Sequence, residues 1–326
     1  MVQILPKAKY TLPPNLDTIP HLLYILSIWA LKKPYITIQK EGVILRTICK
    51  RLFLFFAALI LVLAGITAYL WHSAANCVPV LNYHQINDTE NNALTVKVEQ
   101  FDKQMQYLAD NGYHTITPAD MLDCWENGKP LPDKPVIITF DDGYRDNYIN
   151  AFPILEKYGL KASIFLITDY VSLYPNYVTW DMAKEMQESG LIDLESHTLS
   201  HTELTGLESS EDVVRQLQES RNALQYRLGK PAFFIAYPCG SYDDQVEQLT
   251  KDAGYRAAFT VNYGLASPDE QRFVLDRIPI FGCNQHTFLR FKLRIVLAPV
   301  LSPLSTLKTN LQNSGHTWLS NLILMP

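Results

Sequence analysis

The chain has 326 residues, of which 48% are hydrophobic and 19% charged, and its formal net charge is −5 at pH 7. This length accommodates one large domain with appended segments. The composition argues against a nucleic-acid-binding protein, because basic and aromatic residues do not alternate in the central region. Basic residues instead gather at the two ends, and no Asp or Glu follows Arg277.

The five cysteines show no CxxC pair or other zinc-ribbon spacing; they are Cys49, Cys77, Cys124, Cys239 and Cys283. A disulfide among the last four depends on an oxidising compartment, and the sequence leaves that question open.

Residues 52–71 form an uncharged apolar run that is long enough to cross a bilayer as a helix. Three basic residues, Arg46, Lys50 and Arg51, precede this run, and no further Lys or Arg occurs before Lys97. The positive-inside rule then predicts a cytoplasmic segment over residues 1–51 and an external location for the remainder of the chain.

A cleaved signal peptide is the alternative interpretation, with the small residues 73–75 as its cleavage site. A leader with 51 residues before its apolar run is long for such a peptide, which favours an uncleaved signal anchor. We therefore expect a transmembrane helix at 52–71 and a linker at 72–77.

Predicted strands and helices alternate from residue 78 onward. Strands are expected over residues 78–82, 136–140, 162–167, 192–196, 233–237 and 257–261. Helices are expected over residues 101–111, 150–158, 179–189, 209–228 and 243–253. This alternation predicts an α/β domain with a mostly parallel sheet, long enough to close into a (β/α) barrel over residues 78–283.

A pair of carboxylates follows the continuously hydrophobic strand at 136–140. Asp141 and Asp142 come directly after its end, and Gly143 permits a tight turn away from them. One carboxylate can bind a metal while its neighbour acts as a base. Asp-Asp-Gly is also ordinary turn chemistry, so this motif alone does not define a site.

Two histidines follow the strand at 192–196. His197 and His201 are four residues apart, and they would share one face if this segment were helical. One carboxylate and two imidazoles suit a catalytic site of the Zn²⁺ type. His84 and the turn at 238–240 also follow strands, so all these groups are expected at the catalytic face of a barrel.

Three of these motifs together resemble the polysaccharide deacetylase family, also called NodB-homology proteins or carbohydrate esterase family four. The motifs are TFDDG at 139–143, HTLSH at 197–201 and AYPCGSY at 236–242. The resemblance covers about residues 78–282 and is greatest to the poly-N-acetylglucosamine deacetylase branch. It implies an irregular (β/α) barrel that binds a divalent metal, Zn²⁺ first with Co²⁺ or Ni²⁺ as alternatives, and removes N-acetyl groups.

The resemblance also implies roles for individual residues. Asp141 corresponds to the general base, and Asp142, His197 and His201 correspond to the metal ligands. The backbone N–H of Cys239 would stabilise the oxyanion together with the metal.

Two departures from the family pattern concern the catalytic machinery. The arginine that orients the base in the family is Ala236 here, and we expect Arg277 to substitute for it. The C-terminal Leu-x-x-His motif is missing, so we expect His84 to supply the general acid, with His286 as the rival.

Four aromatic residues are candidates for stacking on sugar rings, namely Tyr144, Trp180, Tyr237 and Tyr242. Ordinary packing is the alternative for each of them. The basic, apolar tail at 284–326 includes an amphipathic stretch at 288–295 that suits either a membrane surface or a helix packed on the barrel.

The sequence thus predicts a membrane-anchored, metal-dependent N-deacetylase acting outside the cytoplasmic membrane. Its expected partners are an N-acetylated polysaccharide, membrane lipid and a glycan synthase complex. An O-acetyl carbohydrate esterase and a catalytically silent glycan-binding barrel are the alternatives.

Overall fold

We describe the protein from a computed structural model, which covers residues 41–268, 271–282 and 287–323. The chain divides into two units, Met1–Leu63 and Ala64–Pro326, and the boundary falls inside helix α2 (Glu41–Ser73).

Helix α2 contains one segment, Cys49–Ser73, that is long and apolar enough to cross a membrane. None of this segment is buried within the protein. The predicted span at 52–71 lies entirely within it.

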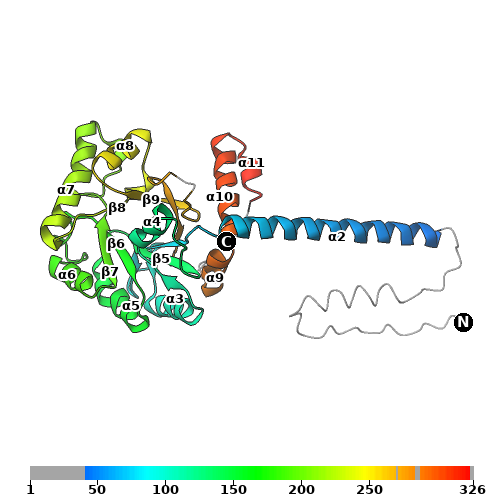
Figure 1. Cartoon of the computed structure of the whole chain (residues 1–326), viewed down its shortest axis with the longest axis horizontal. Helices are drawn as coiled ribbons and strands as arrows, with labels where there is room; N and C mark the ends of the chain where they lie inside the picture. The colour runs from blue at the N-terminus through cyan, green and yellow to red at the C-terminus, as the bar shows by residue number, and fades with distance from the viewer. Residues whose placement is uncertain (1–40, 269–270, 283–286, 324–326) are drawn as a thin grey trace, which may run out of the picture. The chain divides into compact units, whose positions relative to one another are not determined.

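Seven parallel strands close into a barrel in the order β1, β5, β6, β7, β8, β9, β10 and back to β1. Strands β5 to β9 are labelled in Figure 1. The strands are β1 (Val80–Tyr83), β5 (Pro135–Phe140), β6 (Ala162–Leu166), β7 (Ile192–Ser196), β8 (Phe234–Ala236), β9 (Ala257–Tyr263) and β10 (Leu275–Pro279). Short β4 (His114–Thr115) pairs with the start of β5. A separate parallel pair is formed by β2 (Gln85–Ile86) and β3 (Thr95–Val96).

Alternate strand residues belong to two separate apolar clusters, because successive side chains of a strand point to opposite faces. The cluster inside the barrel includes Val80, Ile137, Phe165, Phe234 and Phe259. It also includes Met121 and Leu122 of α4 (Pro118–Glu126), so this helix closes one end of the barrel.

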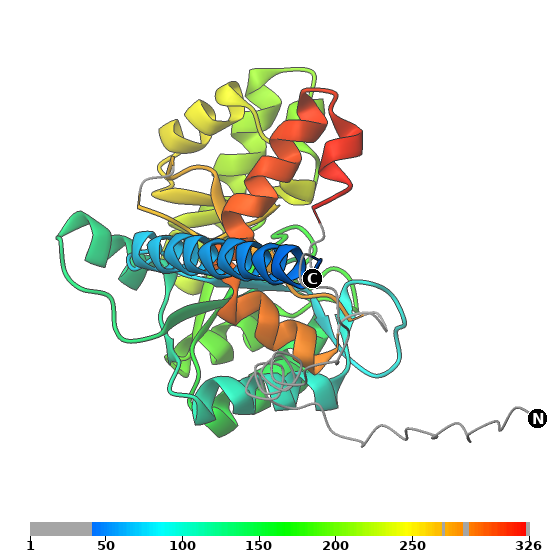
Figure 2. The same ribbon diagram turned by 90° about the vertical axis from the view of Figure 1, so that its right-hand side faces the viewer.

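The other strand face packs under the surrounding helices, seen around the barrel in Figures 1 and 2. These helices are α3 (Val98–Asp110), α5 (Phe152–Tyr158), α6 (Trp180–Glu188), α7 (Ser210–Leu228) and α8 (Asp244–Asp252). A single π turn, Asn147–Ala151, leads into α5. Thr179, Ser209 and Asp243 cap α6, α7 and α8, each accepting a backbone N–H at the helix start.

The predicted barrel is confirmed, with strand ends shifted by up to two residues. The sequence analysis did not predict α4 or β10. Strand β10 completes the barrel between β9 and β1, although its sequence contains the charged Asp276 and Arg277.

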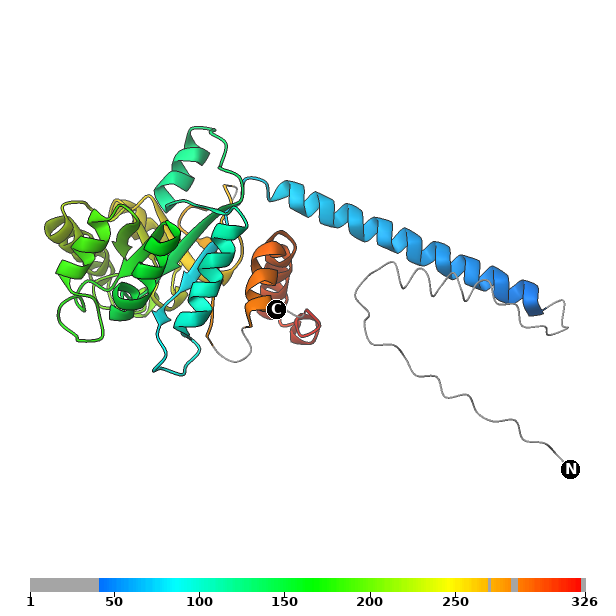
Figure 3. The same ribbon diagram turned by 90° about the horizontal axis from the view of Figure 1, so that it is seen from below.

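Three further helices follow the barrel and lie together on one side of it (Figures 1 and 3). They are α9 (Phe288–Val296), α10 (Ala298–Asn313) and α11 (Thr317–Ser320). Phe291 and Ile295 of α9 are buried, and Phe291 contacts Tyr107 of α3. One face of the predicted amphipathic stretch is therefore packed on the barrel.

Candidate active site

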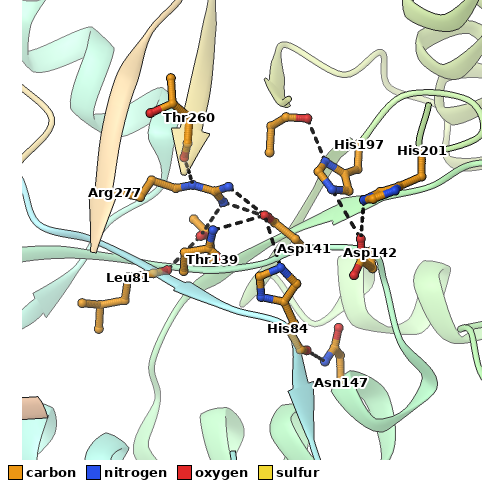
Figure 4. A network of polar contacts seen from close by, with 12 residues as sticks. Leu81, His84, Thr139, Asp141, Asp142, Asn147, His197, His201, Thr260 and Arg277 are labelled. Atoms are coloured by element: carbon orange, nitrogen blue, oxygen red, sulfur yellow. Dashed lines mark hydrogen bonds and ion pairs between the residues drawn. The ribbon is translucent and has the colours of Figure 1, made fainter. Parts of the chain in front are cut away.

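The motif residues meet where neighbouring parallel strands end. Tyr83 of β1 lies beside Phe140 of β5, and Leu166 of β6 lies beside Ser196 of β7. His84, Asp141 and His197 each follow one of these ends and therefore face a common space (Figure 4). The C-terminal ends of barrel strands are where catalytic groups converge.

Asp142, His197 and His201 form a cluster with the geometry of a metal site. The Nε2 atoms of both histidines lie 3.3 Å from Asp142 Oδ1 (Figure 4). The three prospective ligand atoms are all within 4.8 Å of one another. Asp142 Oδ1 is buried and has no hydrogen-bond partner among the described residues. A buried, unpartnered carboxylate oxygen beside two imidazoles fits a divalent cation.

The two histidines are brought together by a turn, because residues 197–201 are not helical. Thr198 and His201 have positive φ angles of 66° and 60°, and Asp142 has a φ of 72°. Such values are strained for residues other than glycine and tend to occur at functional sites. The helical arrangement considered from the sequence is thus replaced by a strained turn.

The ring of His197 is oriented by the backbone. Its Nδ1 lies 2.7 Å from the carbonyl oxygen of Ala236, so Nε2 points toward Asp142. Hydrogen bonds of this type fix the tautomer of metal-binding histidines. Burial alone would raise the pKa of the Asp142 carboxyl, but its contact with His197 lowers that pKa overall.

Arg277 lies directly on Asp141. Its Nη1 and Nη2 donate to Asp141 Oδ1 and Oδ2, each at 2.7 Å, in a fully buried bidentate pair (Figure 4). Arg277 Nε also donates to the carbonyl of Thr260 at 2.8 Å. Burial would raise the pKa of Asp141, but the guanidinium charge outweighs it and holds the pKa well below its ordinary value.

Two further polar residues that the sequence analysis did not single out belong to this network. Asn82 Nδ2 donates to Asp141 Oδ2 at 3.2 Å, and Thr139 Oγ1 accepts from Arg277 at 3.3 Å. Both are buried on strands. The sequence offered one signal for these two residues. Each is a polar residue at a position expected to be buried in a strand, and a buried polar group needs a hydrogen-bond partner.

His84 is near Asp141 but does not contact the metal cluster directly. Its Nε2 lies 4.0 Å from Asp141 Oδ2, and its side chain is 18% exposed. Its backbone carbonyl accepts from Asn147 Nδ2 at 2.7 Å. Burial lowers the pKa of His84, which suits a group that must give up a proton.

The turn after β8 presents the backbone of Cys239, whose φ of 55° is positive. The N–H groups of Gly240 and Ser241 donate to the carbonyls of Tyr237 and Pro238, which closes this turn. Gly240 has a φ of +68°, and a Cβ there would lie 2.5 Å from Val261 Cγ2.

We expect Gly240→Ala to lower the free energy of unfolding by about 1–3 kcal/mol, because it combines a positive φ with a steric clash. Chemical denaturation measures this change. Gly206→Ala is the matched control, since a Cβ there has no neighbour within 4 Å. Equal stability of the two variants would contradict the clash.

The four aromatic candidates have different surroundings. Tyr144 is half-buried beside the site, and its ring stacks on Tyr177 with centroids 5.1 Å apart. Trp180 is half-buried at the start of α6 and lies against Arg227. Tyr242 is also half-buried. Tyr237 is fully buried beneath Tyr242, so its predicted contact with substrate is wrong and its role is packing.

Among the described residues, Cys49, Cys124 and Cys239 are free thiols. Cys283 and the rival acid candidate His286 lie outside the described residues.

Comparison with known proteins agrees with this geometry. Residues 128–258 match the family model described as polysaccharide deacetylase. YxkH of Bacillus subtilis, whose name assigns it to the polysaccharide deacetylases, is 36% identical over 62% of this chain and 71% of its own length. The poly-beta-1,6-N-acetyl-D-glucosamine N-deacetylase of Staphylococcus epidermidis is 30% identical over 66% of this chain and 83% of its own.

A solved structure is also similar. The deacetylase PplD of Streptococcus pyogenes, determined with acetate, is 31% identical, with a TM-score of 0.60 over 63% of this chain and 92% of that one.

The barrel, the candidate site at the C-terminal ends of its strands and these matches together define a polysaccharide deacetylase. The chain belongs to this family and is a hydrolase of amide bonds.

Proposed function

We propose that the protein removes N-acetyl groups from an N-acetylglucosamine-containing polysaccharide in a metal-dependent reaction outside the cytoplasmic membrane. The observation that carries this proposal is the pairing of buried Asp141 with Arg277 beside the Asp142, His197 and His201 cluster. The name of the staphylococcal relative supports the choice of polymer.

The donor set favours Zn²⁺, with Co²⁺ and Ni²⁺ as alternatives, because two imidazoles and one carboxylate suit these ions. Asp142, His197 and His201 would hold the metal. When bound, it would polarise the acetyl carbonyl and make the attacking water more acidic. The metal would also give the buried Asp142 Oδ1 a partner, since this atom has no hydrogen-bond partner among the residues that the structure describes.

The remaining steps belong to the chain's own residues. Asp141 takes the proton of the water that attacks the acetyl carbon, and Arg277 holds this carboxylate in position. The Cys239 amide donates to the oxygen that becomes negative. His84 gives a proton to the departing amine as the carbon–nitrogen bond breaks, which leaves acetate and a free amino sugar.

Tyr144, Trp180 and Tyr242 are the proposed stacking surfaces for the sugar chain. All three rings are half-buried and so keep part of their surface open to solvent. Aromatic faces at this depth combine an apolar contact area with access from outside.

We propose that α2 is an uncleaved signal anchor, with residues 1–51 in the cytoplasm and the barrel outside. The length and apolarity of Cys49–Ser73 and the basic residues before it support this topology. An anchored enzyme would act near the site where a membrane-bound synthase exports its polymer, so such a synthase is a proposed partner.

Acetate and free-amine release by the full-length protein in detergent tests the reaction. We expect both products from N-acetylglucosamine oligomers, loss of activity after chelation, and recovery with Zn²⁺, Co²⁺ or Ni²⁺. Acetate release from O-acetylated xylan without amine release from the oligomers would instead show an esterase. Absence of both activities with metal still bound would show a glycan-binding barrel.

The general acid is tested separately. We expect His84→Gln to lower turnover by about 10²- to 10⁴-fold without changing metal content, because general acid–base groups contribute that much. Steady-state kinetics and metal analysis of purified protein measure both quantities. Full activity of His84→Gln together with an inactive His286→Gln variant would reassign the acid to the tail.

A further inference from the structure

The three C-terminal helices and the turn after α11 carry a set of exposed apolar residues, which we call the C-terminal apolar surface. Its members are Leu289, Leu293, Val296, Leu304, Leu307, Trp318 and Leu322. Trp318 is 67% exposed and Leu322 is 71% exposed. Isolated exposed apolar residues are common, but six on consecutive helices, with Leu322 just after them, are the kind of exposed apolar surface that marks an interaction site.

In α9, the spacing of the exposed apolar residues places them on the helix face opposite the buried one. Leu289, Leu293 and Val296 follow the i, i+4, i+7 pattern of one helical face. Phe291 and Ile295 occupy the other face and are buried on the barrel. Helix α9 therefore has an apolar face that the barrel fills and a second apolar face that the described residues leave exposed.

The charge of this region is of one sign. Residues 287–323 contain four basic residues and no acidic residue; the basic residues are Arg290, Lys292, Arg294 and Lys308. Lys292 lies over the rings of Tyr107 and Phe288, at the edge of α9. Arg294 is buried and donates to the carbonyl of Pro279, whereas the half-buried Arg290, Lys292 and Lys308 keep part of their side chains at the surface. An apolar helix face bordered by these three cations is complementary to a membrane with anionic lipids.

The position of α10 in the fold is the third observation. Ser302 of α10 accepts the N–H of Leu265 at 3.3 Å, and the adjacent Ala266 pairs with Val78. Val78 is separated from the end of α2 by only residues 74–77. Four residues span at most about 14 Å, so α10 lies close to the point where the chain enters the barrel from α2.

We propose that the C-terminal apolar surface docks on the outer face of the lipid bilayer and binds anionic phospholipids. The barrel is then held by two contacts, the spanning helix α2 and this surface. The argument from position uses the transmembrane role of α2 in the proposed function, whereas the apolar and charge arguments do not.

The test uses the full-length protein reconstituted into vesicles of phosphatidylglycerol and phosphatidylcholine. A fluorescent amino acid replaces Leu307, or Leu293 in a second variant, and the vesicles contain phospholipids brominated on their acyl chains. Tyr226 on α7, which is 83% exposed, is the control position for the same label. Bromine quenches only those fluorophores that reach the acyl region.

We expect labels at positions 307 and 293 to be quenched at least about twofold more than a label at 226, because docked helices sit at the headgroup–acyl boundary. Lys292→Gln combined with Lys308→Gln should reduce the quenching, whereas Lys184→Gln on α6 should not. Vesicles of phosphatidylcholine alone should show weaker quenching than the anionic vesicles.

Quenching at 307 and 293 no greater than at 226 would overturn the proposal. A blue-shifted emission at 307 without bromine quenching would also overturn it, by assigning the surface to a protein partner such as a second copy. Alkaline carbonate extraction of the same vesicles reports separately on whether α2 spans the bilayer, and the deacetylase assay reports separately on catalysis.

Discussion

Replacing Arg277 with alanine should lower kcat by about 10²- to 10³-fold while leaving the metal content unchanged. The reason is that the bidentate contact to Asp141 holds the proposed base in one orientation, and misplacing a general base removes most of its contribution. Arg277 does not contact the metal cluster in the described structure, so Asp142, His197 and His201 should still bind metal. Steady-state kinetics with metal analysis of the purified variant measures both effects.

The same substitution should destabilise the fold, because it leaves a buried carboxylate without its partner. Breaking one side of a buried ion pair costs about 3–5 kcal/mol. Activity must therefore be expressed per folded molecule, at a temperature where the variant is fully folded.

Two variants separate positioning from folding. Arg277→Lys keeps the charge but cannot form the two parallel hydrogen bonds, so it should recover stability more than turnover. Arg272→Ala removes an exposed arginine that pairs with Glu126 and should leave kcat unchanged. Near-normal turnover of folded Arg277→Ala would remove Arg277 from the mechanism.

Replacing His197 with alanine should abolish both metal binding and turnover. A catalytic metal provides several kcal/mol of transition-state stabilisation, and a loss of about 4 kcal/mol corresponds to roughly 10³-fold in rate. His197 is nearly fully buried and its Nε2 faces Asp142, so no other described side chain can replace it without rearrangement.

A thermal shift provides a readout that does not depend on activity. A ligand that binds only the native state raises the melting temperature. Added Zn²⁺ should therefore stabilise the wild-type protein after chelation but not the His197→Ala variant. His114→Ala is the control, because the side chain of His114 is exposed and its Nδ1 lies 2.6 Å from the carbonyl oxygen of Asp133. Equal Zn²⁺ stabilisation of wild type and His197→Ala would contradict the assigned ligand set.

Much of the barrel could be predicted from the sequence because its signals are local. The continuous apolar run at 136–140 defines a buried strand, and Asp141 and Asp142 follow it within the same segment. The same holds for His197 after β7. Local hydrophobic pattern and turn chemistry are sufficient to place such residues at strand ends.

Helix α4 was missed although its start signals are local, namely a capping box between Thr117 and Asp120 with Pro118 at the first helical position. Strand β10 was missed because its assignment depends on a distant partner. Arg277 interrupts the apolar pattern of β10, and its position in the barrel interior is acceptable only because Asp141 pairs with it. The sequence of β10 alone does not reveal that Asp141 balances the charge of Arg277. A charged residue in a short segment otherwise argues for a surface position.

Tyr237 and Tyr144 show that the sequence also could not decide which aromatic side chains are open to substrate. Both follow or end predicted strands, and both were equally good candidates from residue type. The structure buries Tyr237 completely and leaves Tyr144 half-buried beside the metal cluster. Which side of the chain faces solvent after a strand ends depends on the loops that cover it, and those contacts are non-local.

The sequence by itself determined the family, the residue types of the candidate metal site and the apolar helix before the barrel, since each is encoded in contiguous stretches. Only the tertiary structure decided which residues complete the site. Strand β1 lies between β5 and β10, and this closure brings Arg277 onto Asp141 across 136 residues of sequence. The turn geometry at His201 and the exposure of apolar residues on α9, α10 and α11 were decided in the same way. Each depends on packing between segments that are far apart in the chain, which no local pattern specifies.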